Sequence, residues 1–168
     1  DNHIIIVNKA SGEIVQGDKT GDEPLVETLK KFIKERDAKP GNVFMGLVHR
    51  LDRPVSGVVV FAKTSKALSR LNEMFRNGDV HKTYWAVTAA RPPKEEDTIT
   101  SYITTVEKTN RSYASARPKA GAKEARLAYR LIAASDRYNL LEVNLMTGRK
   151  HQIRVQLSSI GCPVKGDL

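Results

Sequence analysis

The chain has 168 residues, of which 40% are hydrophobic and 28% are charged, and it carries a formal net charge of +9. This is the size of one ordinary globular domain, and no apolar run approaches the roughly 20 residues that span a membrane. A single cysteine, Cys162, excludes an internal disulfide and indicates a reducing compartment, so we expect a cytoplasmic protein. The excess of Lys and Arg favours a polyanionic partner, because phosphate contacts release counterions.

The first half of the chain predicts strands and helices in alternation. Apolar residues that recur at helical spacing predict a helix over 25–36, after a short strand over 3–8. Strands over 43–48 and 57–63 flank a polar turn, and a helix capped by Thr64 or Ser65 follows and extends to residue 76.

The second half is richer in strands, which follow one another with only turns between them. We expect strands at about 82–88, 98–105, 126–133 and 140–145, and a last helix at 150–160. This order indicates an α+β fold, with a mixed, mainly antiparallel β-sheet and flanking helices, and not a doubly wound parallel sheet.

Basic residues gather between positions 108 and 130, where Glu124 is the only acid. They are Lys108, Arg111, Arg117, Lys119, Lys123, Arg126 and Arg130. The stretch suits contacts with a nucleic acid backbone, and the alternative is a solvated charged face.

The first cluster with chemical potential is the segment 49–52, His-Arg-Leu-Asp, which lies in the turn between two apolar strands. Such a turn can hold the Asp52 carboxylate rigidly at the edge of a core. A structural ion pair and an ordinary turn aspartate are the alternative.

A second cluster opens the strand at 82–88. Strand alternation places Tyr84 and Ala86 on one face, with Thr83 and Trp85 on the other. Tyr84 could stack on a base, at about 1–3 kcal/mol, or be half-buried core.

The third cluster, residues 147–154, precedes and begins the last helix. We expect Thr147 to cap this helix, and Lys150 and Arg154, four residues apart, to share one helical face. The cluster suits binding of a phosphate or a carboxylate. His151 is expected to be a hydrogen-bonded structural histidine.

Other chemistries fit the sequence poorly. The 4 histidines and the lone cysteine show no metal-ligand spacing, and no glycine-rich phosphate loop is present. Ser56 lacks the first glycine of a nucleophile elbow. We therefore expect no metal and no cofactor.

Together, and in this order, the clusters resemble the RluA-type family of pseudouridine synthases. The matching segments are 49–52 with Ser56-Gly57, then 61–64, 82–84 and 148–154, and flanking matches at 7–12 and 161–167 extend the resemblance over nearly the whole chain. The sequence departs from the family pattern at 53–55, Lys150, Gln156 and Cys162.

The resemblance implies an isomerase that converts specific uridines of tRNA or rRNA to pseudouridine by base detachment, rotation and reattachment through C5. It implies that Asp52 is the catalytic carboxylate, that Arg154 holds it ionised, and that Tyr84 packs on the target base. Arg50 would fill the space that the base vacates. The expected RNA-binding residues are His49, Arg50, Arg53, Lys82, Arg149 and Lys150.

The resemblance further implies that residues 1–168 are one catalytic domain, trimmed at its C-terminus, without an S4-type RNA-binding domain, and that it acts as a monomer on RNA. Two alternatives stay open: an inactive RNA-binding module that kept the fold, and a glycosidase that releases the base. A phosphate-handling enzyme is a third and poorer fit.

Overall fold

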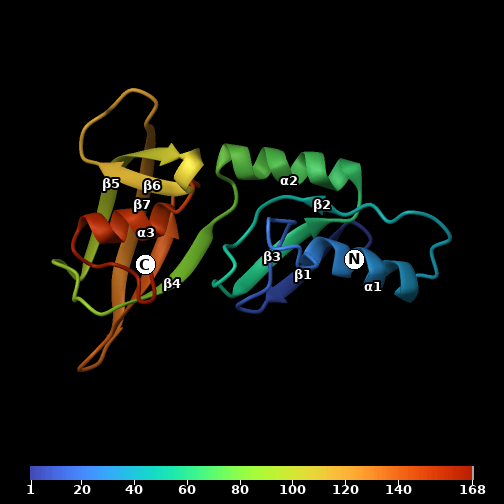
Figure 1. Ribbon diagram of the computed structural model, residues 1–168, viewed down its shortest axis with the longest axis horizontal. Coiled ribbons are helices and arrows are strands. Elements are labelled where there is room, and N and C mark those ends of the chain that lie inside the picture. The colour runs from blue at the N-terminus through green and yellow to red at the C-terminus, as the bar shows by residue number, and fades with distance from the viewer. Residues whose placement is uncertain (168) are drawn as a thin grey trace. The chain divides into compact units, whose positions relative to one another are not determined.

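The computed structural model describes residues 1–167, which fold as two compact units (Figure 1). The first unit is Asp1–Asp79 and the second is Val80–Leu168. The expectation that both belong to one catalytic domain stays a prediction, and each unit is described by itself.

The first unit is a small antiparallel sheet with two helices. Its elements are β1 (Ile4–Lys9), α1 (Leu25–Arg36), β2 (Gly46–Leu47), β3 (Gly57–Ala62) and α2 (Ser65–Asn77). The sheet order is β1-β3-β2. Leu29 and Ile33 of α1 pack against Val59 and Phe61 of β3, and this apolar cluster forms the core of the unit.

Two local signals set the bounds of α2. Thr64 caps the first turn, since its hydroxyl accepts a hydrogen bond from the Ala67 backbone N–H at 3.1 Å. Gly78 ends the helix with φ 83°, a left-handed conformation that glycine adopts without a Cβ clash. The predicted Thr64 cap is therefore confirmed, and the helix ends at Asn77, one residue later than predicted.

The second unit is a five-stranded antiparallel sheet covered on one face by a helix. Its elements are β4 (Lys82–Thr88), β5 (Glu96–Val106), a 3-10 turn (Glu107–Thr109), β6 (Arg111–Ser115), β7 (Lys123–Ala134), β8 (Asn139–Leu145) and α3 (Gln152–Ser159). The strand order is β4-β8-β7-β5-β6. Leu157 of α3 packs on Leu127, Leu141 and Val143, which are all fully buried.

The predicted α+β class and the antiparallel pairing are confirmed, and α1 and β4 have the predicted bounds. The strand predicted over 43–48 is shorter, because only Gly46 and Leu47 find partners on β3. Strand β6 was not predicted. It pairs with β5, and its five residues, Arg-Ser-Tyr-Ala-Ser, show little apolar alternation of their own.

None of the helices in the described part of the chain is both long and apolar enough to cross a membrane.

Candidate active site

Asp52 lies in the turn that joins β2 to β3, and its side chain is exposed. Its backbone carbonyl accepts a hydrogen bond from the Val55 N–H at 3.0 Å, which closes the turn. The chain then enters β3 through Gly57, whose φ of +138° is strained for any residue with a Cβ. The glycine of the Ser-Gly pair after Asp52 thus has a structural reason.

The C-terminal side of this turn is held by a buried ammonium group. Lys9 is 0% exposed and pairs with Gly57 at the end of β1. Its Nζ donates to the carbonyls of Ala10 at 2.8 Å, Arg53 at 3.1 Å and Val55 at 2.6 Å. Burial lowers the pKa of Lys9, while Glu13 opposes this shift. The backbone just after Asp52 is therefore fixed to β1.

The N-terminal side of the turn is held by His49. Its Nε2 accepts a hydrogen bond from the Val60 N–H at 3.0 Å. Its ring stacks on Phe75 of α2, with centroids 5.1 Å apart and planes at 22°. Arg50, next in the chain, is exposed. The geometry gives His49 a positioning role, and the RNA contacts of both residues stay predictions.

The Arg53 side chain is engaged by an acidic loop. Its guanidinium donates to Asp22 at 2.7 Å, Asp18 at 3.2 Å and the Thr20 hydroxyl at 2.6 Å. The bond from Arg53, followed by that from Thr20, lowers the pKa of Asp22. An RNA phosphate would have to compete with these carboxylates, and the predicted RNA contact of Arg53 stays a prediction.

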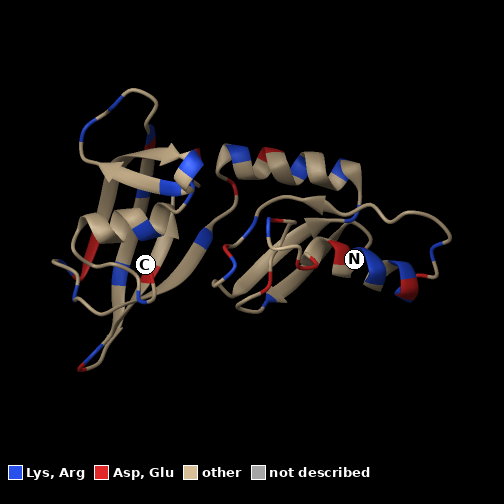
Figure 2. Ribbon diagram, in the orientation of Figure 1, with Lys and Arg blue, Asp and Glu red and all other residues tan. Residues whose placement is uncertain are grey.

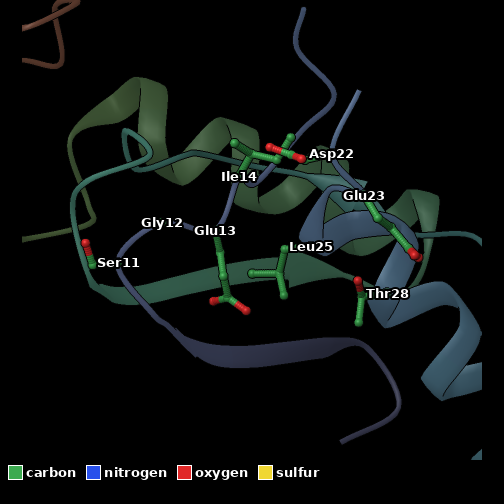
Figure 3. A pocket seen from close by; sticks show the side chains of 8 residues that line it. All are labelled: Ser11, Gly12, Glu13, Ile14, Asp22, Glu23, Leu25 and Thr28. Carbon is green, nitrogen blue, oxygen red and sulfur yellow. The ribbon is translucent and has the colours of Figure 1, made fainter. Parts of the chain in front are cut away.

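A pocket of about 290 Å³ lies in the same unit, next to this loop (Figure 3). Its walls carry the carboxylates of Glu13, Asp22 and Glu23. Negative charge at its walls repels a phosphate backbone, so this pocket does not suit RNA.

Among the described residues, no group of three or more His, Cys, Asp or Glu is arranged to hold a metal ion.

In the second unit, the predicted second and third clusters come together. Tyr84 is half-buried and packs at the edge of the core, while Trp85 on the other face is 72% exposed, as strand alternation predicts. Lys82 shares the face of Tyr84, and burial lowers its pKa. A Cβ built on Gly148 would lie 3.6 Å from the Lys82 Nζ, an ordinary contact distance, so the two clusters are neighbours at this point.

A buried amide organises the segment before α3. Gln152 is 3% exposed, and its Oε1 accepts from the Thr147 hydroxyl and the Arg149 N–H, both at 2.9 Å. Its Nε2 donates to the Arg126 carbonyl on β7 at 3.0 Å. This single side chain ties the loop to the sheet.

Two details of the third cluster differ from the prediction. Thr147 does not cap α3, because the cap position is occupied by His151 with φ 56°. The helix begins at Gln152, so Lys150 precedes it and does not share a helical face with Arg154. The predicted helix started too early because Lys150 and His151 are acceptable helix residues and nothing in the sequence signals the left-handed residue.

The two arginines of this cluster have different partners. Arg149 donates from Nε to the Glu124 carbonyl on β7 at 3.0 Å. Arg154 donates from Nε to Asp167 Oδ1 at 2.7 Å. The RNA-binding roles of Arg149 and Lys150 and the catalytic role of Arg154 stay predictions.

The sequence pattern assigned no role to Lys9, Gln152 or Asp167. For Lys9 a signal existed, since a lysine that ends an apolar strand beside a turn needs partners for a buried ammonium. For the contact of Gln152 with β7 and the contact of Asp167 with Arg154 no local pattern predicts the partner, because each contact joins distant segments.

The chain thus combines an α+β fold, an exposed carboxylate on a turn held from both sides, and a second unit rich in Lys and Arg, and these features suit a protein that acts on a nucleic acid. The family described as RNA pseudouridylate synthase matches residues 3–159. The chain therefore belongs to this family, and the RluA-type resemblance is confirmed.

Relatives with the same description match almost the whole chain. It is 35% identical over 181 residues to tRNA pseudouridine synthase C of Vibrio cholerae, covering 99% of the chain and 70% of that relative. It is 30% identical over 167 residues to ribosomal large subunit pseudouridine synthase C of the same organism, covering 99% and 50%. The solved human RNA pseudouridylate synthase domain containing 4 superposes with a TM-score of 0.83 at 28% identity, covering 99% of this chain and 65% of that one. The chain thus spans about half to 70% of the length of these proteins.

The Lys9 contacts lead to a stability prediction. Lys9→Met removes the ammonium from three backbone carbonyls, and we expect the free energy of unfolding to fall by about 1–3 kcal/mol or more. Urea denaturation measures the change. Lys31→Met is the matched control, because Lys31 forms only an exposed ion pair with Glu23, and its loss should stay within about 0.5 kcal/mol. Equal losses for the two variants would contradict the account.

The Arg53 contacts lead to a pH prediction. In the folded chain Asp22 stays ionised to lower pH than in the unfolded chain, so the stability that it contributes is present at neutral pH and is lost as pH falls through its lowered pKa. We expect Arg53→Gln to raise the pKa of Asp22 toward the usual 3.8, as measured by carboxyl NMR titration. Arg50→Gln should leave that titration unchanged. Identical Asp22 curves for the parent and Arg53→Gln would refute the role of Arg53.

Proposed function

We propose that this chain carries the catalytic part of an RNA pseudouridine synthase, an isomerase with Asp52 as its catalytic carboxylate. The observation that supports this most is the exposed position of Asp52 on a turn held from both sides, by Lys9 and by His49. A reacting group benefits from such rigidity, because misplacement by about 1 Å can cost about 100-fold in rate.

The reaction breaks the bond between ribose C1′ and uracil N1 and forms a bond between C1′ and C5. The C5 proton leaves, and N1 gains a proton, so the product has the composition of the substrate. Asp52 acts on the ribose, either by adding to it or by assisting its deprotonation. Ordinary glycosidases use two carboxylates to activate water and protonate a leaving group. Here the base is kept, so one carboxylate is sufficient.

We propose that Tyr84 and Arg154 act on the same uridine as Asp52. The half-buried ring of Tyr84 offers a surface against which a base can pack, and its hydroxyl is the candidate for removal of the C5 proton. The Arg154 guanidinium suits a carboxylate, because its planar fork of donors keeps Asp52 ionised and directed. Arg50 is exposed and suits the space left when the target base leaves its stack.

The proposed substrate is structured RNA, either tRNA or rRNA, since relatives named for both match the chain at 30–35% identity. The charge supports this choice. Figure 2 shows Lys and Arg along the loop between β6 and β7 and on the strands beside it, the stretch that contains Arg117, Lys119 and Lys123. We further propose action as a monomer in the cytoplasm, where the lone buried Cys162 would stay reduced.

Tritium release from RNA that carries 5-tritiated uridine tests the role of Asp52, with tRNA and rRNA transcripts as separate substrates. We expect release by the parent and at least about a 1,000-fold lower rate for Asp52→Asn, which keeps the shape but not the charge. Asp37→Asn is the matched control, because this aspartate of the same unit pairs with Arg36 after α1 and should leave the rate unchanged. An Asp52→Asn variant with the parent's rate would refute the assignment.

A further inference from the structure

The Asp167 carboxylate contacts one edge of the Arg154 guanidinium. The Nε of Arg154 donates to Asp167 Oδ1 at 2.7 Å, and its Nη2 forms an ion pair with the same oxygen. Because the guanidinium is planar and its donors are rigidly spaced, contacts from both Nε and Nη2 fix the plane as well as the position. The Nη1 edge then points away from Asp167.

Asp167 is itself held in place. Its N–H donates to the Val164 carbonyl at 3.0 Å, Val164 bridges to Thr88, and the Lys165 N–H donates to the Val87 carbonyl at 2.7 Å. Thr88 and Val87 end β4, the strand that carries Tyr84. The segment of Asp167 therefore links α3, through Arg154, to the strand of the proposed base-packing tyrosine.

The burial of this pair separates it from ordinary surface ion pairs. The Asp167 side chain is 18% exposed, the lowest value for an acid among the ion pairs of the described residues, and Arg154 is 39% exposed. A pair on the open surface adds little to stability, because water screens it and two side chains lose freedom. A less exposed pair with two converging donors holds its geometry better.

The charge of this pair also bears on its role. A carboxylate beside Arg154 offsets part of the guanidinium's positive charge, which would weaken a residue whose task was only to attract RNA from a distance. The same contact suits a residue whose guanidinium must point in one fixed direction.

We propose that Asp167 is a positioning residue that sets the direction in which Arg154 presents its guanidinium to the RNA substrate. This inference rests on the proposed function and deepens it. Asp167 touches neither the substrate nor Asp52 in this role, and it acts through Arg154 alone.

The test measures kcat and KM for tritium release with Asp167→Asn and Asp167→Ala. We expect kcat to fall about 10-fold for Asp167→Asn, which keeps one acceptor oxygen, and about 100-fold for Asp167→Ala, with KM within about 3-fold of the parent. Glu142→Ala is the matched control, because Glu142 pairs with Arg130 in the same unit and its loss should leave kcat unchanged. Thermal unfolding of each variant shows whether it is folded.

A double-mutant cycle then separates positioning from a general structural role. In an Arg154→Lys background, where the planar fork is already lost, Asp167→Ala should cost less than about 3-fold in kcat. Three results would overturn the inference and leave the proposed function standing. They are the same loss of kcat in both backgrounds, a change in KM alone, and an unchanged kcat when Asp167 is replaced in the parent. Absence of tritium release by the parent would instead overturn the proposed function, and the inference with it.

Discussion

The buried ammonium of Lys9 is the interaction on which the geometry around Asp52 depends. Buried away from water, it donates hydrogen bonds to three backbone carbonyls, and two of these belong to the turn that follows Asp52. Because β1 pairs with β3 along its whole length, that turn is tied to the sheet of the first unit. His49 does the same on the other side of Asp52, so that the carboxylate is exposed while its backbone is not free to move.

In the second unit, a different polar group holds the backbone near the predicted site residues. There a buried amide, Gln152, ties the loop before α3 to β7, and the Arg154–Asp167 pair ties α3 to the segment beside β4. In both units, polar side chains that are buried or half-buried hold backbone segments from which other polar side chains project. Such groups add less to net stability than to uniqueness of geometry, because leaving any of them unpaired is costly.

The sequence predicted the fold class and most element bounds because periodicity and caps are local signals. Apolar spacing predicts helix α1 and strand β4, and the hydroxyl of Thr64 predicts the start of α2. The position of Lys9 signals that its ammonium needs partners but not which ones, and the contacts of Gln152 with β7 and of Asp167 with Arg154 were not predictable, since each joins segments that are distant along the chain. Strand β6 was missed because its pairing with β5 is set by the neighbouring strand, not by its own residues. The proposed site residues came from a family pattern and stay predictions, and the contacts that hold their segments required the structure.

The central claim is that one carboxylate suffices because the base is retained. The direct measurement is a mass-spectrometric balance of uridine, pseudouridine and free uracil after incubation of the parent chain with tRNA and rRNA transcripts. The account predicts that pseudouridine appears in the amount in which uridine is lost, without free uracil. Release of uracil, with abasic sites left in the RNA, would contradict it and identify a glycosidase.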